Sequence, residues 1–236
     1  MTNALNFKKI FRDLDFNIAH NIDIISFNEY TLTQIAPQNS AQFIDFYLFN
    51  YKKVHSSLGD YSATNAMIND VYADNALYKE SSVYLILKRN GNLLATLKGT
   101  KRQALPLRTE REFGFNILQY LNRTSFDGLS VWHHSKTSID KDQLSNEKHD
   151  TKILLRIIYE ALYIKIYYDG CDILLGEVND LNYRSMDANG IKMEIVTKPL
   201  KTIGMPAYGI AISRENISRF INNPGLEATG KNFNLK

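Results

Sequence analysis

The sequence predicts a mixed α/β domain with a central sheet of about six to seven strands flanked by helices. The first observation behind this prediction is a β-hairpin. Ser82–Lys88 is rich in apolar and β-forming residues, Asn90-Gly91 is a preferred pair for a tight turn, and Leu93–Thr100 returns as the partner strand. The second observation is the long apolar stripe of 151–168 at helical spacing, followed by the short buried-type strand of 171–178.

The other elements follow from the same two periodicities. The strand-like alternation of 30–36 stops at Pro37, and apolar residues at helical spacing predict a helix over 40–55. The stretch 58–69 is rich in Ser, Asn, Gly and Asp, which favours a loop or a short helix. Thr109-Glu-Arg-Glu112 resembles a capping box and predicts a helix to about Leu121. The remaining predicted elements are strands at 128–139, 191–197 and 206–212 and helices at 180–189 and 213–221.

One folded domain is the economical interpretation. Hydrophobic residues make up 44% of the 236 residues, which is enough for a sizeable core. We expect 1–29 to be a lead-in, 30–221 to form the domain, and the Gly- and Asn-rich 222–236 to be a flexible tail. The loop predicted near 57–80 leaves open a small separate N-terminal layer.

Charge and composition limit the partners. The net charge of +3 is too small to favour nucleic acid unless it is concentrated on one face. The single cysteine, Cys171, excludes an intrachain disulfide and is expected to be a buried thiol. No signal-peptide pattern and no apolar run long enough to span a bilayer is visible, so we expect a cytoplasmic protein. The spacing of the histidines predicts no metal site.

Short segments of the chain are similar to motifs of one enzyme family. Trp132-His-His-Ser-Lys-Thr-Ser-Ile-Asp140 is similar to the autoinducer-synthase strand Trp-Glu-x-Ser-Arg-Phe-x-Val-Asp. Ala95-Thr-Leu-Lys98 lies on the return strand of the hairpin, where the family often has Gly-Thr-Leu-Arg. The other matching positions are the acidic pair Asp70 and Asp74, Leu105-Pro106 with Phe113, and Gly190-Ile191.

With the order of elements over about 30–215, these segments resemble the GNAT-type acyltransferases, and most closely their N-acyl amino acid and acyl-homoserine-lactone synthases. The resemblance implies transfer of a medium or long acyl group to an amine such as an amino acid. The donor would be a thioester on acyl carrier protein, through its phosphopantetheine, or on coenzyme A, and no metal would be needed. An acyl carrier protein and a small amine acceptor are the implied partners.

The chain departs from the family pattern at several polar positions. Lysines, Lys98 and Lys136, stand where the family has arginines, and Arg and Lys do not bind carboxylates alike. His133 occupies the glutamate position, and Met186 occupies the place of a general-acid tyrosine. The region between 139 and 151 contains no glycine, unlike the usual phosphate-binding loop. Two alternatives therefore stay open: an acetyl-CoA-dependent acetyltransferase, or an inactive module that binds ligands or partners.

The expected site combines residue chemistry with this resemblance. Glu177 ends a buried strand, where a carboxylate is either paired structurally or held as a base, and Tyr183 is the candidate acid. On a regular strand His134 shares a face with Trp132 and Lys136, and that face is either a wall of the site or a surface exposed to solvent. The expected substrate-binding residues are Lys98, Phe113, Trp132, His134, Lys136 and Asn179. The expected donor-binding residues are Ile139, Lys148 and Thr151.

Overall fold

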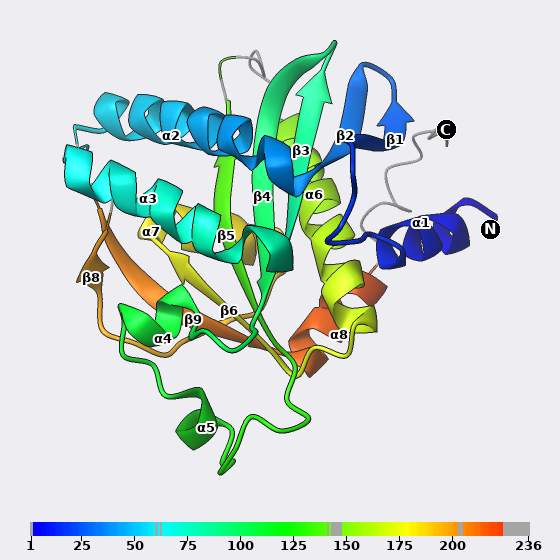
Figure 1. Cartoon of the computed structure of the whole chain (residues 1–236). Coiled ribbons are helices and arrows are strands. Elements are labelled where there is room, and N and C mark those ends of the chain that lie inside the picture. Colours follow the sequence, from blue (N-terminus) through cyan, green and yellow to red (C-terminus); the bar gives the residue numbers. More distant parts are fainter. Residues whose placement is uncertain are drawn as a thin grey trace.

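The computed structural model describes residues 2–59, 61, 63–140, 142, 148–202 and 205–223, and its centre is a twisted sheet (Figure 1). In the described residues the strand order is β1-β2-β3-β4-β5-β6-β9-β7, with β8 also beside β9. Among the described strands, only β5 and β6 are parallel neighbours. The strands are β1 Ile22–Phe27, β2 Tyr30–Ile35, β3 Ser82–Arg89, β4 Asn92–Lys101, β5 Val131–Ile139, β6 Ile173–Val178, β7 Glu194–Ile195, β8 Leu200–Lys201 and β9 Pro206–Ser213.

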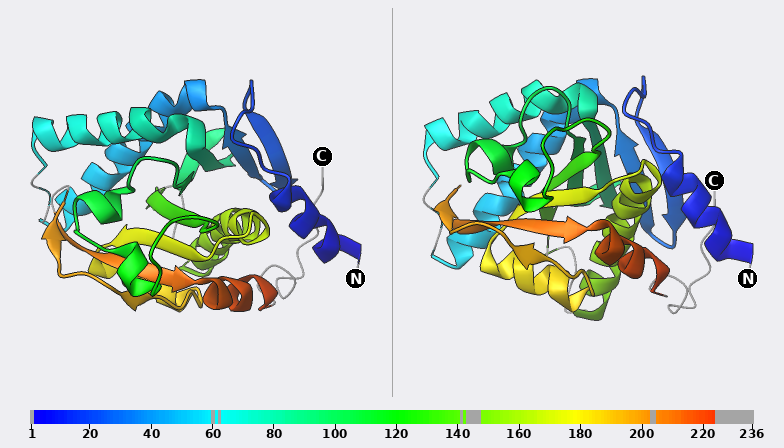
Figure 2. Two further views of the ribbon diagram at one scale, coloured as in Figure 1. Left: turned by 60° about the horizontal axis from the view of Figure 1, so that its bottom comes forward. Right: turned by 90° about the horizontal axis from the view of Figure 1, so that it is seen from below.

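Helices cover both faces of this sheet, as the two views of Figure 2 show. On one face α2 and α3 lie side by side across β3, β4 and β5, and on the other face α6 packs between the sheet and α1 and α8. The helices are α1 Thr2–Arg12, α2 Ser40–Ser57, α3 Asn65–Tyr78, α4 Arg108–Arg111, α5 Ile117–Tyr120, α6 Lys148–Tyr168, α7 Asp180–Ala188 and α8 Arg214–Asn222. The mixed α/β class and the flanking helices are therefore as the sequence predicts.

Several local expectations are confirmed. The β3–β4 hairpin turns at Asn90-Gly91, whose positive φ angles of 48° and 81° fit a type that glycine and asparagine favour. The apolar stripe of α6 is buried, and Gly99 on β4 lets Leu162 approach the sheet so closely that an added Cβ would lie 2.4 Å from it. Cys171 is fully buried, and burial raises the pKa of its thiol.

Other expectations were wrong at the level of single elements. The stretch expected to be a loop near 57–80 contains α3, which Thr64 caps and whose Val71 and Tyr78 are buried. The helix expected from 109 to 121 is two short helices, because Gly114 takes a positive φ of 65° between them. The lead-in 1–29 adds α1 and β1 to the fold, so the sheet has more strands than expected. The tail beyond 223 lies outside the described residues.

The feature of the fold that creates the site is the separation of β5 from β6 (Figure 1). Their parallel pairing begins at Val131–Ile173 and ends at His134–Gly176. Immediately afterwards a β-bulge interrupts β5, because Thr96 pairs with Ser138 whereas Lys98 pairs with Ser135. Lys136 sits in this bulge with a φ of +56°. Beyond this point the edge of β5 that faces β6 has no partner strand in the described structure.

His134 and Gly176 fit together at the point of separation. A Cβ added to Gly176 would lie 2.2 Å from the His134 ring and 3.2 Å from its carbonyl oxygen. The absence of a side chain on Gly176 therefore lets the imidazole fill the space between the two strands.

We expect Gly176→Ala to destabilise the protein by roughly 1–3 kcal/mol, because overpacking displaces a buried ring. Thermal unfolding should show a Tm lower by about 2–4 °C per kcal/mol. In a double-mutant cycle with His134→Ala, most of this loss should disappear. Equal losses from Gly176→Ala with and without His134 would contradict the close fit.

Candidate functional site: the cleft between the separated strands

Three adjoining cavities lie where β5 and β6 separate. We call the largest, about 140 Å³, the outer cavity; it is lined by residues of α2, the end of β5, α6 and α7. Two smaller cavities of about 50 and 40 Å³ lie deeper, and we call them together the inner cleft. Asn182 of α7 lines all three. The inner cleft is lined by Tyr47, Tyr51, Arg108, His134, Ser135, Lys136, Thr137, Tyr159, Glu177, Val178, Asn179, Asn182, Met186, Thr202 and Ala207.

The bulge in β5 decides which side chains enter the inner cleft. A regular strand would place Lys136 on the same face as His134, as expected from the sequence, and that assignment was wrong. The extra residue turns Lys136 to the opposite face, where its Nζ lies 5.6 Å from the centre of the Tyr47 ring and 4.0 Å from Asp74. Lys136 thus brings a buried cation into the cleft, at the side that α2 covers.

Glu177 anchors the charges of the cleft. Its Oε1 accepts a hydrogen bond from Thr109 Oγ1 at 2.6 Å and lies 2.7 Å from His133 Nε2. Burial alone would raise the pKa of Glu177, but His133, Arg108 and Thr109 outweigh burial and lower this pKa to about 2. The carboxylate is therefore ionised at neutral pH and too weak a base to accept a proton, so it acts as a fixed counter-charge.

The two lysines of the expected site have different surroundings. Lys98 lies under α3, with its Nζ 3.3 Å from Asn75 Oδ1, and it lines none of the three cavities. Burial, with a smaller contribution from Lys136, lowers the pKa of Lys98 to about 7. Burial and then Arg108 lower the pKa of Lys136 as well. Of these two lysines, Lys136 is the one that combines a lowered pKa with a place in the cleft.

His134 reaches the inner cleft from the other face of the sheet. Its Nδ1 lies 3.0 Å from the Tyr163 hydroxyl, and its ring fills the space above Gly176. Burial, and to a smaller extent His133, lower the pKa of His134 to about 3. The ring is therefore neutral near pH 7 and contributes a hydrogen-bonding wall rather than a charge.

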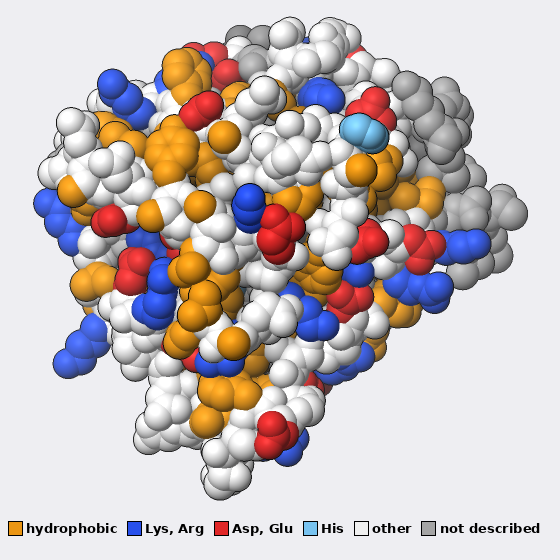
Figure 3. All heavy atoms as spheres, viewed as in Figure 1, with side chains coloured by type: hydrophobic (Ala, Val, Ile, Leu, Met, Phe, Trp, Pro, Cys, Tyr) orange, Lys and Arg blue, Asp and Glu red, His pale blue; other side chains and the backbone are white. Residues whose placement is uncertain are grey.

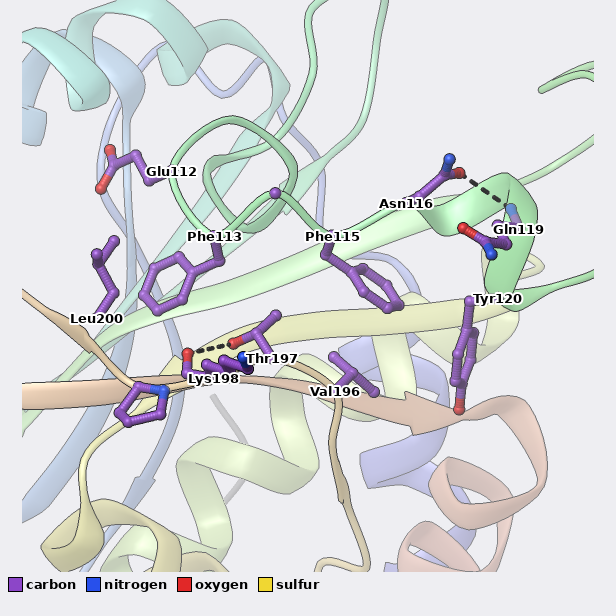
Figure 4. Close-up of a pocket in the computed structure, with 12 residues that line it drawn as sticks. Glu112, Phe113, Phe115, Asn116, Gln119, Tyr120, Val196, Thr197, Lys198 and Leu200 are labelled. Atoms are coloured by element: carbon purple, nitrogen blue, oxygen red, sulfur yellow. Dashed lines mark hydrogen bonds between the residues drawn. The ribbon is translucent and has the colours of Figure 1, made fainter.

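A wider groove lies beyond the inner cleft, and Figure 4 shows its side chains. Its volume is about 630 Å³, and it runs between the segment 112–120 and the segment 196–200. Phe113, Phe115 and Tyr120 line one side, and Val196 and Leu200 line the other. We call it the aromatic groove. Its lining mixes these apolar side chains with polar ones, and its volume is within the roughly 300–1,000 Å³ typical of ligand pockets.

An ion pair separates the aromatic groove from the inner cleft. Arg108 lines the cleft, Glu112 lines the groove, and their side chains meet at 2.8 Å one helical turn apart. Arg108 and Glu112 therefore link the cleft to the groove, and Tyr51 and Asn182 line both the cleft and the outer cavity.

The structure brings together some of the residues expected from the sequence and leaves others apart. Those in the inner cleft are His134, Lys136, Glu177 and Asn179. Ile139 and Thr151 line the outer cavity, and Phe113 lines the aromatic groove. Trp132 is fully buried against Phe16 on the α6 side, and Tyr183 packs against the same core, so neither is placed at the cleft. Lys148 begins α6, and its side chain lies outside the described residues.

Sequence reasoning missed several residues that form the cleft. Arg108, Tyr47 and Tyr51 come from α4 and α2, and only the tertiary fold brings them to β5. The sequence does contain a signal for Asn182. Asn179 is a typical N-cap residue whose side chain accepts a hydrogen bond from the Asn182 backbone, so Asn182 lies in the first turn of α7.

The surface and the arrangement of side chains add three observations. The face shown in Figure 3 carries acidic and basic side chains interspersed with apolar ones. Within the described part of the chain, no group of three or more His, Cys, Asp or Glu side chains is placed to hold a metal ion. No described helix is both long and apolar enough to cross a membrane.

The mixed α/β fold of this chain is similar to that of solved GNAT-type acyltransferases. One solved structure with this fold is FeeM, an N-acyl amino acid synthase from uncultured soil microbes, with a TM-score of 0.56, 13% identity, and 82% of this chain and 95% of that chain covered. An acetyltransferase from Streptococcus agalactiae gives a TM-score of 0.51 and 9% identity, with 79% and 99% covered.

These likenesses confirm the fold class predicted from the sequence, and at the level of the fold they confirm its resemblance to the N-acyl amino acid synthase branch. No protein-family model and no curated protein matches the sequence. The activity therefore has to be argued from the cleft itself.

The anchoring role of Glu177 predicts a pH-dependent loss of stability. Because its folded pKa of about 2 lies below the ordinary 4.5, its stabilisation is complete above pH 4.5 and is lost as the pH falls towards 2. We expect Glu177→Gln to lower the free energy of unfolding at pH 7 by roughly 3 kcal/mol, since it leaves buried cations without a counter-charge.

Urea unfolding of both proteins between pH 7 and the lowest pH at which both remain folded measures this difference. The gap should narrow below pH 4.5. A gap that stays constant across the acid range would show that the carboxylate charge is not what stabilises the cleft.

Proposed function

We propose that the protein is an N-acyltransferase that moves a medium or long acyl group from a carrier thioester to a small amine such as an amino acid. The observation that carries the proposal is the open edge of β5 beside β6, with the buried Lys136 in the bulge at that edge. An extended arm can pair with an open strand edge. A nearby cation can then stabilise the charge that develops at the reacting carbonyl.

The donor enters through the outer cavity. Its walls are the end of β5 and the facing sides of α2, α6 and α7, so it leads directly to the open edge of β5. The phosphopantetheine arm, which acyl carrier protein and coenzyme A share, carries amides that suit such an edge. The glycine-free region after Ile139 favours an arm delivered on a carrier protein, since backbone amides approach a pyrophosphate closely only with glycine. We place this reaction in the cytoplasm.

Lys136 is the residue to which we assign the chemistry. The acceptor nitrogen attacks the thioester carbonyl, the C–N bond forms and the C–S bond breaks. The ammonium of Lys136 stabilises the oxyanion and gives its proton to the departing thiolate, and the proton released by the acceptor nitrogen restores it. A lowered pKa suits this role, because the proton is given up more readily. The charges of Glu177 and Arg108 set the electrostatic field around Lys136, and Asn179 lines the same cavity.

The acyl chain continues from the cleft into the aromatic groove. A donor arm in the outer cavity and a carbonyl near Lys136 direct the chain towards Arg108 and Glu112, whose side chains must part to admit it. Beyond them Phe113 and Phe115 offer apolar surface. The acceptor amine then approaches from the side lined by Tyr51 and Thr202.

The test of the activity is a transfer assay with acyl carrier protein and coenzyme A donors against a panel of amines. Thiol release and mass spectrometry of the N-acyl product give the rate. We expect Lys136→Met to lower kcat roughly 10²-fold with little change in the KM for the donor, because the proton donor is lost and the arm site is intact. Lys101→Met, on the neighbouring strand and outside the cleft, is the matched control and should be unchanged.

Absence of product from every donor and amine, with the wild-type protein folded, would overturn the proposal. Transfer only from acetyl-CoA would favour the acetyltransferase alternative. Donor binding without transfer would favour a binding module.

The aromatic groove predicts a chain-length effect. We expect Phe113→Ala to lower kcat/KM for a dodecanoyl donor by roughly 10–100-fold, because burying a phenylalanine-sized apolar surface contributes roughly 1.5–3 kcal/mol. The value for an acetyl donor should stay the same. Phe49→Ala removes an exposed phenylalanine of α2 and serves as the control. An equal loss for both donors would show that the groove does not hold the chain.

A further inference from the structure

Asn50 of α2 is buried without a hydrogen-bonding partner. Only 1% of its surface is exposed, and neither its Nδ2 nor its Oδ1 has a partner among the described residues. It also lines the outer cavity. Leaving a buried amide unpaired costs roughly 1–3 kcal/mol, so an apolar side chain of similar shape would make the empty protein more stable. An unpaired amide on a residue that lines a cavity points to a ligand whose polar group reaches that amide when the cavity is occupied.

The outer cavity is shaped for one small uncharged polar group. Its volume of about 140 Å³ is close to that of cavities that hold a benzene-sized ligand (about 150 Å³). Val54, Leu155 and Leu181 make much of the wall apolar. None of its lining residues is a Lys, Arg, Asp or Glu in the part of the chain that the structure describes. A carboxylate or a phosphate would lose its water there without meeting a lysine or an arginine, and His55 is the one histidine of the described lining.

The carboxamide of Asn50 offers donors and an acceptor together, and a secondary amide offers the complementary acceptor and donor. The cavity also opens on the end of β5, where Thr137, Ser138 and Ile139 lie beside the strand edge that β6 leaves unpaired. An amide with its flanking methylenes matches the cavity in size, polarity and position.

We infer that Asn50 determines the specificity for the donor by pairing with a secondary amide of its pantetheine arm. This inference rests on the proposed function for the identity of the ligand. Asn50 is a positioning residue, because it holds the arm and does not touch the thioester. The Asn50 amide has no hydrogen-bonding partner among the described residues, and the donor would supply that partner.

The test compares two unreactive probes that differ in one group. The first is S-butyl N-acetylcysteamine, which carries one secondary amide, and the second is the matching ester, in which oxygen replaces the amide N–H. Calorimetric titration without any acceptor should show wild-type protein binding the amide roughly 5-fold more tightly, the contribution of one hydrogen bond. Asn50→Leu should bind both probes equally, and Asn69→Leu, an exposed asparagine of α3, should keep the preference.

Thermal unfolding of the empty proteins gives a second readout. Asn50→Leu should have a higher Tm than wild type, because an unpaired amide is replaced by an apolar side chain of similar shape. A lower Tm together with an unchanged amide preference would overturn the inference and assign Asn50 to packing or to a buried water.

The two proposals fail separately in this design. Amide preference that depends on Asn50, without any acyl transfer in the activity assay, would keep this inference and contradict the proposed function. Acyl transfer by a wild-type protein that binds the amide and ester probes equally would support the proposed function and contradict this inference.

Discussion

The cleft depends on a single constraint, which is that β5 and β6 cannot remain paired beyond His134 and Gly176. The His134 ring takes the space above Gly176, and the bulge at Lys136 then shifts the register of β5 against β4. A parallel sheet normally satisfies the polar groups of both neighbouring strands. Here one edge of β5 is left open inside the molecule, and this opening lets α2 and α7 place side chains between the strands.

Burying cations beside that opening requires a strong counter-charge. Glu177 provides it for Arg108, and Thr109 and His133 hold its carboxylate in the charged form. Asp74 and Glu177 together offset the effect of Arg108, which lowers the pKa of Lys136. The network fixes the field of the cleft before any ligand arrives, which is how electrostatic stabilisation is obtained without reorganisation.

The sequence predicts the parts of this arrangement that depend on local periodicity. The β3–β4 hairpin, α6 and the buried strand β6 all follow from spacing and turn residues, and their order is sufficient to predict the fold. Which side chains point to which face of β5 was not predictable. The bulge places Lys136 at a positive φ, and no glycine in the sequence indicates a bulge there. Arg108 and Tyr51 reach the cleft through tertiary packing alone. The start of α3 was not predicted, because its N-cap, Thr64, lies within the polar stretch 58–69.

Several energetically unfavourable groups of the described structure lie around the opening. Lys136 has a weakened hold on its proton and a positive φ, and Asn50 has an unpaired amide. The opposite side of the sheet, around α6 and Trp132, is a packed apolar core. Unpaired or strained groups lower the stability of the empty protein. Proteins often keep such groups at a binding site, where a ligand supplies the missing contacts. A cleft whose buried groups lack partners in the described structure therefore supports the proposal that an acyl donor binds there.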